Sequence, residues 1–391
     1  MTAGDIYFDN AATTPLDPRV REAMLPFLGA QYGNPSSLHA AGRTARTAVD
    51  NAREAVAALL GATPPEIIFT ASGTEADNLA VLGVLAQHEV SPQHVVVSAI
   101  EHPAVLETCR HAERRGAGVT YLPVAANGIV EPETLAAALR PETRLVSVMA
   151  ANNVVGTLQP ISQLARVAHD HGALFHTDAV QAAGKMPLDV VRLGVDLLSL
   201  SAHKLHGPQG VGALYVKRGL TLSPAVFGGG QERGLRSATE NVAGLVGCGE
   251  AARIARDEMV QEAVRLVALR DRIFAGIAAC GKNAYVVGDR FRRLPGHVCV
   301  AFAGLEAEAI KLLLALDEQR IFVSSGSACS SHHAGEPSHV LRAMGYDPVQ
   351  AQGALRITLG RFSTSAEVDH FLDVLPRTLQ TLRPATTRVI I

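Results

Sequence analysis

A cysteine in a polar loop is the first feature of this sequence that could do chemistry. Cys329 lies in the stretch S-S-G-S-A-C-S-S-H-H, residues 324–333, among small and polar side chains. A cysteine kept for packing stands instead in an apolar run, as Cys299 does in H-V-C-V-A-F. Because a thiolate is both a nucleophile and a metal ligand, three interpretations of Cys329 are open: a mobile nucleophile, a metal ligand or an inert loop residue.

Polar side chains also follow five short apolar runs that are typical of β-strands. In an open parallel sheet, ligands bind beyond the carboxyl ends of the strands, so these side chains are expected at one edge. Each residue alone has an ordinary explanation, such as a helix cap for Asp178, a turn for His102 or a surface position for Lys204. Five strand ends together predict a binding site. The residues are Gly73 and Thr74 after 66–70, His102 after 94–98, Asn153 after 145–149, Asp178 and Gln181 after 173–177, and Ser201, His203 and Lys204 around the end of 197–201.

The residue types at this edge suit pyridoxal phosphate. That cofactor needs a lysine for a Schiff base and an acid beside its pyridine nitrogen, which Lys204 and Asp178 supply. It also needs a flat group against its ring, here His102, and hydroxyls with a helix N-terminus for its phosphate. Neither G-x-G-x-x-G after a first strand nor a G-K-S/T loop occurs, so a nicotinamide dinucleotide and a P-loop nucleotide are not expected. The residues assigned to the phosphate are Gly73, Thr74, Ser201 and His203.

The order of the elements predicts an α/β protein. Apolar runs alternate with alanine- and leucine-rich stretches of helical period, as in crossover units with a mostly parallel sheet. After about residue 222, a glycine-rich loop, a long helix over 241–279 and further short elements predict a smaller α+β domain. We expect residues 15–260 to form the large domain, and residues 1–14 with 261–391 to form the small one. The predicted strands are 66–70, 94–98, 119–122, 145–149, 173–177, 197–201 and 211–216, then 297–302, 321–324 and 354–359, with a helix at 307–317.

The composition argues against several classes of partner. Of the 391 residues, 48% are apolar, so the chain can bury a large core. A net charge of −2 gives no reason to expect nucleic acid. No apolar run reaches the ~20 residues that span a bilayer, and no signal peptide is visible. The five cysteines are scattered without a C-x-x-C pair, so a reducing cytoplasm is the expected location.

Several motifs together resemble those of cysteine desulfurases of the NifS/IscS type, in the class V aminotransferase superfamily. The likeness runs nearly end to end. It implies fold type I of the pyridoxal-phosphate-dependent transferases, with a seven-stranded, mostly parallel sheet, a smaller α+β domain and a homodimer. The motifs are Y-F-D-N-A-A-T-T-P, Y-G-N-P-S-S-L-H, S-G-T-E-A-D-N, S-A-I-E-H-P-A-V-L, F-H-T-D-A-V-Q-A-A-G-K, S-L-S-A-H-K, G-G-G-Q-E-R-G-L-R-S, S-S-G-S-A-C and E-P-S-H-V-L-R-A-M-G.

The resemblance implies a role for each residue of the predicted site. Lys204 would hold the cofactor and move the substrate's Cα proton, and His102 would stack on the ring and assist that transfer. Asp178 would pair with the pyridinium nitrogen, and Gln181 would contact the ring hydroxyl. The implied phosphate contacts are Thr74, Ser201 and His203, with Thr239 reaching across from a second subunit, and the implied contacts to the substrate carboxylate are Asn153 and Arg356, with Asn34 close by.

The resemblance also implies an answer for Cys329. Its thiolate would take sulfur from L-cysteine as a persulfide, alanine would leave, and the sulfur would pass to an iron–sulfur scaffold protein or towards tRNA thiolation. The small residues of the loop, about 324–338, suit a thiol that must move. His332 and His333 follow the thiol, but a stable metal site usually has four ligands, so no metal is expected. We interpret both histidines as solvated or as stabilising the thiolate.

Four positions depart from the family's motifs. Val154 stands where the family has a glutamate, and its loss changes the local hydrogen bonding. His206 and Gln209 replace a tyrosine and a lysine in the stretch that follows Lys204. Ala238 replaces a glycine just before the threonine assigned to the second subunit.

Two other functions are open. A selenocysteine lyase, or a cysteine C–S lyase that releases sulfide without a persulfide, would use the same cofactor. A non-catalytic sulfur carrier or scaffold subunit would use none, and the joint presence of Lys204, Asp178 and Cys329 argues against it. Replacing Cys329 distinguishes a desulfurase from such a lyase, because the lyase does not need this thiol.

Overall fold

The main sheet has the predicted α/β architecture. The computed structural model describes residues 4–87, 93–281, 283–305, 309–325 and 337–382. Within these ranges the main sheet has seven strands in the order β2-β8-β7-β6-β5-β3-β4. Its neighbouring strands are parallel, except that β8 runs antiparallel to β2 and β7. The strands are β2 (Ile67–Thr70), β3 (His94–Ser98), β4 (Gly118–Leu122), β5 (Thr143–Ser147), β6 (Leu174–Asp178), β7 (Leu197–Ser201) and β8 (Gly212–Val216).

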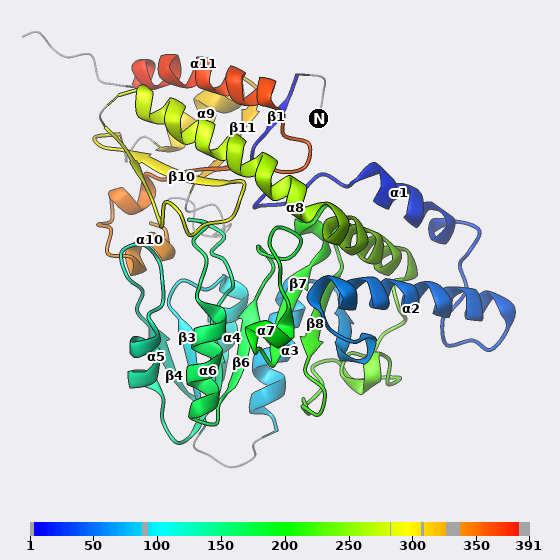
Figure 1. Ribbon diagram of the computed structural model, residues 1–391. Coiled ribbons are helices and arrows are strands. Elements are labelled where there is room, and N and C mark those ends of the chain that lie inside the picture. Colours follow the sequence, from blue (N-terminus) through cyan, green and yellow to red (C-terminus); the bar gives the residue numbers. More distant parts are fainter. Residues whose placement is uncertain (1–3, 88–92, 282, 306–308, 326–336, 383–391) are drawn as a thin grey trace, which may run out of the picture.

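Helices cover both faces of this sheet (Figure 1), and successive strand residues enter two different cores. On β3, Val95 and Val97 pack in one core, while Val96 packs in the core of the opposite face. Burial on both faces explains why the strands are almost continuously apolar. One face is covered by α3 (Gly73–Leu85) and α4 (Pro103–Arg114), and the other by α1 (Pro18–Met24), α2 (Ala40–Leu60), α5 (Pro132–Ala138), α6 (Ile161–Asp170), α7 (Val190–Leu193) and the first half of α8 (Val242–Ala279).

A further core joins the N-terminal strand to the C-terminal third of the chain. Phe8 is fully buried in it and lies edge-on to Phe371, with ring centroids 6.0 Å apart. Helix α8 is one unbroken helix that contributes to two cores (Figure 1). Leu245, near its start, packs against the main sheet, and Ile273, near its end, packs in the same core as Phe8. The elements here are β1 (Ile6–Tyr7), β9 (Ala284–Val286), β10 (His297–Phe302), α9 (Ala309–Glu318), β11 (Ile321–Phe322), β12 (Ser324–Ser325), α10 (His339–Ala343), β13 (Leu355–Thr358) and α11 (Ser365–Leu382).

Most predicted strands and the long helix agree with the structure to within one residue at each end, but two predicted strands were wrong in detail. The run 321–324 is not one strand: β11 pairs in parallel with β1, and β12 pairs with β13 in a separate sheet. The strand predicted at 145–149 is β5, which begins at Thr143 and ends at Ser147; beyond it, the N–H of Met149 donates to the carboxylate of Glu101. The predicted domain boundary at residue 260 falls inside α8. Among the described helices, none combines the length and the apolar character that crossing a bilayer requires.

Phe8 should be essential for the core that joins the two ends of the chain. Phe8→Ala removes a fully buried ring and its contact with Phe371, so we expect it to lower the free energy of unfolding by about 3–5 kcal/mol in urea titrations. The matched control is Phe291→Ala, whose ring is 86% exposed and whose loss should cost less than about 0.5 kcal/mol. Equal effects of the two changes would contradict the assignment of Phe8 to this core.

Candidate active site

Lys204 stands in a short turn at the end of β7. The strand passes into the turn η3 (Ala202–Lys204), and the N–H of Gly207 closes the turn by donating to the Ala202 carbonyl, 2.9 Å away. The Nζ of Lys204 donates to the carbonyl oxygens of Ala11 and Ala12, each at 2.6 Å. The N-terminal segment of the chain therefore holds this amine at the carboxyl edge of the sheet.

Asp178 is the buried last residue of β6. Its Oδ1 accepts a hydrogen bond from the N–H of Val180, 2.9 Å away. Burial raises the pKa of this carboxyl to about 6, against the opposing effects of that hydrogen bond and of the positive charge of Lys204. The carboxylate form therefore still predominates at neutral pH. Such a carboxylate is the partner that a protonated pyridine nitrogen requires.

Gln181 is connected to Lys204 through the same N-terminal carbonyl. Its Nε2 donates to the carbonyl oxygen of Ala11 at 2.9 Å, which fixes the orientation of the amide. Its Oε1 accepts from the Nζ of Lys185 at 3.4 Å. Burial, together with the charges of Lys204 and Arg356, lowers the pKa of Lys185 to about 7. Lys185, for which the sequence predicted no role, therefore lies beside Gln181, the residue predicted to contact the cofactor ring.

His102 is held as a neutral imidazole. It is the N-cap of α4, and its Nδ1 accepts a hydrogen bond from the N–H of Ala104 at 3.1 Å. Burial lowers the pKa of His102 to about 4, and the charges of Lys204 and His339 act in the same direction. Because Nδ1 accepts, the proton of the neutral ring is on Nε2. A neutral ring can stack flat on another ring and exchange a proton at that atom.

The start of α3 packs closely against the ends of β6 and β7. A Cβ added at Gly73 would lie 2.7 Å from Val180 Cγ2 and 3.3 Å from Ser201 Cβ, so only glycine allows this approach. The N–H groups of the first helical turn have no acceptor within the helix, and Ser72 caps that of Glu75 at 3.0 Å. Thr74 is exposed in the same turn. The helix N-terminus thus has a geometry that binds phosphate groups.

His203 lies in the lysine turn between Ser201 and Lys204. Its Nδ1 is 3.0 Å from the hydroxyl of Thr13, and its carbonyl accepts from the N–H and the hydroxyl of Thr14. Burial lowers the pKa of His203 to about 4, with Lys204 acting in the same direction. The structure therefore places His203 at the same sheet edge as its predicted neighbours, with the N-terminal segment packed against it.

Arg356 is a fully buried arginine on β13. It donates through Nη1 to the carbonyl of Asn153 at 3.0 Å and through Nη2 to Oδ1 of Asp9 at 2.8 Å. Among the described residues, its Nε has no hydrogen-bond acceptor. Burial raises the pKa of Asp9, although the guanidinium opposes that shift. The sequence reasoning found Arg356 and Asn153 but missed Asp9, which lies inside the quoted motif Y-F-D-N-A-A-T-T-P.

Two buried acids near Asp178 were also missed. Asp77 on α3 lies 3.6 Å from Nε2 of His176, and Glu101 accepts the N–H of Met149 at 2.8 Å. Burial raises the pKa of both carboxyls well above the usual range, and the charge of Asp178 adds to the shift. These shifts favour the protonated form of both acids, and the negative charge of Asp178 is one of their causes. Their motifs, S-G-T-E-A-D-N and S-A-I-E-H-P, contain the only sequence signal.

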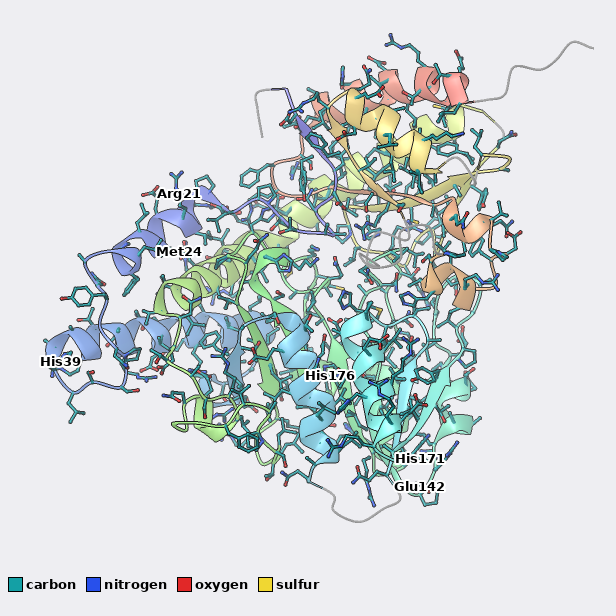
Figure 2. The ribbon with its side chains drawn as sticks, turned by 180° about the vertical axis from the view of Figure 1, so that it is seen from behind. Arg21, Met24, His39, Glu142, His171 and His176 are labelled. Carbon is teal, nitrogen blue, oxygen red and sulfur yellow. The ribbon has the colours of Figure 1, made fainter. Side chains whose placement is uncertain are left out.

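The structure does not bring every predicted residue to this site. Asn34 is exposed and precedes the N-cap of α2, His39, which lies at the outer end of the molecule and away from His176 in the sheet (Figure 2). Thr239 is exposed beside Glu240, which pairs with Arg46 on α2 at 2.6 Å. Within one chain, neither residue therefore lies beside Lys204. Cys329, His332 and His333 lie outside the described residues.

The change at Val154 is accommodated by an apolar cluster. Val154 is buried with Val340 and Leu341 of α10, so a carboxylate would be unfavourable here. Its carbonyl accepts from Nε2 of His297 at 2.9 Å. Gln209 and Ala238 are both exposed. Apolar packing between α10 and the segment that follows β5 thus takes the place of the family's carboxylate.

The fold and the geometry of this edge define a class of protein. The family model for class-V aminotransferases matches residues 6–371, and the chain belongs to this family. The structure is similar to that of a NifS-like protein, with a TM-score of 0.90 and 40% identity over 96% of this chain and all of the other. It is also similar to SspA in complex with cysteine, with a TM-score of 0.81 and 35% identity over 92% of this chain and all of the other.

Within this family, the chain is most informatively compared with cysteine desulfurases. It is 47% identical to the cysteine desulfurase IscS of Dictyoglomus turgidum, over 97% of this chain and 95% of that protein. It is 50% identical to the cysteine desulfurase of Cereibacter sphaeroides, over 97% of this chain and 96% of that protein. These relatives confirm the resemblance to the NifS/IscS type that the motifs predicted.

The positive charge of Lys204 should be measurable at His102. In the protein without cofactor, we expect Lys204→Met to raise the pKa of His102 from its low value near 4, because a neighbouring cation that disfavours the imidazolium is lost. Titration of the His102 ring by NMR measures this shift. The control is Lys217→Met, which removes a lysine paired with Asp196 at 2.9 Å and should leave His102 unchanged. A pKa of His102 that did not rise in Lys204→Met would place the two side chains too far apart to act together.

Proposed function

We propose that this protein is a cysteine desulfurase that uses pyridoxal phosphate to convert L-cysteine to L-alanine and takes the sulfur on Cys329 as a persulfide. The observation that carries the proposal is the convergence at one sheet edge of four groups. They are an amine held by main-chain carbonyls, a buried carboxylate, a neutral imidazole and a buried guanidinium, supplied by Lys204, Asp178, His102 and Arg356. The desulfurase relatives support the same reaction.

The residues at this edge fit pyridoxal phosphate. Gly73 lets the N-terminus of α3 lie close to Ser201, because a Cβ at this position would clash with Val180, and the N-terminus of a helix suits a phosphate. Asp178 would face the ring nitrogen and Lys204 would bind the aldehyde. When bound, the cofactor withdraws electrons from the carbon skeleton of an attached amino acid. Burial, together with the charge of Asp178, raises the pKa of Asp77 and of Glu101, and the same negative charge on Asp178 would stabilise the ring cation.

Three side chains would handle the substrate. Arg356 would bind the carboxylate of L-cysteine, because its fork is planar, permanently charged and already oriented by Asp9. Asn153 lies directly against this guanidinium through its carbonyl. Lys204, once freed from the carbonyls that hold it, would carry the proton between positions on the substrate. His102 would assist at Nε2, since its neutral ring can accept a proton at pH 7.

Cys329 would perform the sulfur transfer. Its thiolate would attack the sulfur of the substrate, so that an S–S bond forms as the Cβ–S bond breaks. The electron pair of the broken bond remains on the three-carbon fragment, which takes up one proton and leaves as alanine. Cys329 is left as a persulfide, and a second thiol or an iron–sulfur scaffold protein would then accept the sulfur.

The four described cysteines are free thiols, which supports a reducing compartment such as the cytoplasm.

We further propose a homodimer that completes this site. A cleft of about 520 Å³ lies between the N-terminal end of α2 and the glycine-rich loop, lined by Ser36, Arg46 and residues 229–233. The segments beside it expose large apolar side chains that a soluble monomer would rarely leave uncovered, and they also carry Thr239 and Asn34. A second copy of the chain would cover these side chains. They are Leu28, Tyr32, Leu38 and Phe227, exposed by 66%, 86%, 91% and 82%.

Replacement of Cys329 tests the sulfur transfer. We expect wild-type protein loaded with pyridoxal phosphate to produce alanine from L-cysteine and to gain the mass of one sulfur on Cys329. Cys329→Ser should form no persulfide and lose alanine production by about 10³-fold or more, because the nucleophile is gone. The control is Cys280→Ser, which changes a partly exposed thiol at the C-cap of α8 and should remain active. Equal alanine production by Cys329→Ser and wild type would instead identify a lyase that releases sulfide directly.

A charge on the exposed apolar surface tests the dimer. We expect Phe227→Arg to convert the protein to a monomer in sedimentation experiments and to weaken cofactor binding, because Thr239 could no longer reach the second site. Phe291→Arg places the same charge on a ring that is equally exposed, 86% against 82%, but lies elsewhere. It should leave the assembly intact. If both variants remained dimeric, the interface would have to involve another surface.

A further inference from the structure

His206 occupies an unusual backbone conformation directly after the lysine turn. Its φ is 65°, a left-handed value that residues with a Cβ rarely adopt. The main chain is fixed on both sides: the N–H of His206 donates to Thr14 Oγ1 at 2.8 Å, and its carbonyl accepts from the N–H of Asp17 at 3.0 Å. A strained residue held in this way, two positions from Lys204, is a candidate for a functional role.

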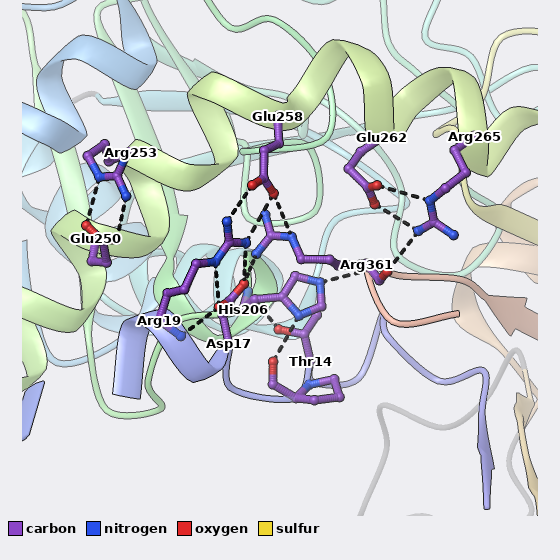
Figure 3. A network of polar contacts seen from close by, with 11 residues as sticks. Thr14, Asp17, Arg19, His206, Glu250, Arg253, Glu258, Glu262, Arg265 and Arg361 are labelled. Atoms are coloured by element: carbon purple, nitrogen blue, oxygen red, sulfur yellow. Dashed lines mark hydrogen bonds and ion pairs between the residues drawn. The ribbon is translucent and has the colours of Figure 1, made fainter. Parts of the chain in front are cut away.

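The ring of His206 links two segments that are far apart in the sequence (Figure 3). Nδ1 donates to the carbonyl oxygen of Pro15 at 2.9 Å, and Nε2 accepts from the main-chain N–H of Arg361 at 3.4 Å. The ring also lies edge-on to Phe362, with centroids 5.3 Å apart. This arrangement needs a neutral ring with its proton on Nδ1. Burial lowers the pKa of His206 to about 4, with Arg361 and Lys185 acting in the same direction and Pro15 and Asp17 opposing it, so the ring is neutral at pH 7.

The segment that His206 contacts continues directly from the strand that carries Arg356. Arg361 pairs with Asp17 at 2.7 Å and with Glu258 at 3.3 Å. Arg265 on α8 donates to the carbonyls of residues 360, 361 and 363 and so fixes the same segment (Figure 3). A displacement of this segment would be transmitted along β13 to Arg356. His206 therefore connects the turn that carries the Lys204 amine to the segment that follows Arg356.

We propose that His206 is a positioning residue, whose neutral ring sets the placement of Arg356 relative to Lys204 and thereby the fit of the substrate carboxylate. The inference rests on the proposed function, because it assumes that both groups act on one amino acid. The ring of His206 donates from one nitrogen and accepts at the other, whereas a tyrosine would have to donate and accept at its single hydroxyl oxygen.

The test uses equilibrium binding, which does not require turnover. L-Alanine carries the carboxylate that Arg356 would bind, whereas ethylamine lacks it, and both can be titrated by the visible absorption of the bound cofactor. In His206→Asn, the shorter amide keeps a donor near Pro15, tolerates the left-handed backbone and loses the acceptor for Arg361. We expect L-alanine to bind about tenfold more weakly while ethylamine binding is unchanged, because a clamp on the carboxylate has moved. His206→Gln, which can restore the acceptor for Arg361, should recover part of the lost affinity.

The matched control is Arg19→Gln. Arg19 pairs with Asp17 and Glu258 in the same polar network, so its loss destabilises the network without touching the ring of His206. It should lower the melting temperature and leave the ratio of the two affinities unchanged. If His206→Asn behaved like this control, His206 would be structural only and the inference would be wrong. If wild type failed to bind pyridoxal phosphate as a borohydride-reducible adduct at Lys204, the proposed function would fail instead.

Discussion

The candidate site depends on the N-terminal segment that lies between the lysine turn and β13. Carbonyls of Ala11 and Ala12 hold the Lys204 amine, and the Ala11 carbonyl also accepts from Gln181. The N–H of Ala11 donates in turn to Thr358 Oγ1 at 2.9 Å, at the end of the strand that carries Arg356. One extended stretch of main chain therefore supplies the contacts that place the amine, the amide and the guanidinium together. A displacement here would disturb all three groups.

The charge of Lys204 organises the electrostatics of this edge. Burial is the main cause of the low pKa values of His102, His203 and Lys185, and the charge of Lys204 lowers them further. The same charge opposes the rise in pKa that burial causes in Asp178. The two imidazoles are neutral and the carboxylate is ionised as a result of these combined effects. Burial alone would protonate the acid more strongly, so the cation and the desolvation act on it in opposite directions. His102 and His203 are thus uncharged and Asp178 is charged, although all three side chains lie at the same edge of the sheet.

Much of the fold and the site could be predicted from the sequence, for reasons that the structure makes clear. Strand residues such as Val95, Val96 and Val97 are apolar because both faces of the sheet are covered, and polar residues at strand ends stand out against that background. The roles of Asp9 and of the Ala11 carbonyl could not be predicted, since they arise from contacts with residues at least 170 positions away. Local pattern also cannot show that Ile321 and Ser324 belong to different sheets, because only the position of β1 decides it.

The parallel pairing of β1 with β11 also bears on how the protein is made. Ile6 lies opposite Ile321, so β1 leaves the ribosome more than three hundred residues before its partner strand. All strands of the main sheet, from β2 to β8, precede residue 217, and the lysine turn lies between β7 and β8. The segment that holds Lys204 is placed only when the last third of the chain has folded, because such long-range contacts close late. A nascent chain would thus carry a folded sheet before the main-chain carbonyls that hold Lys204 had reached their place.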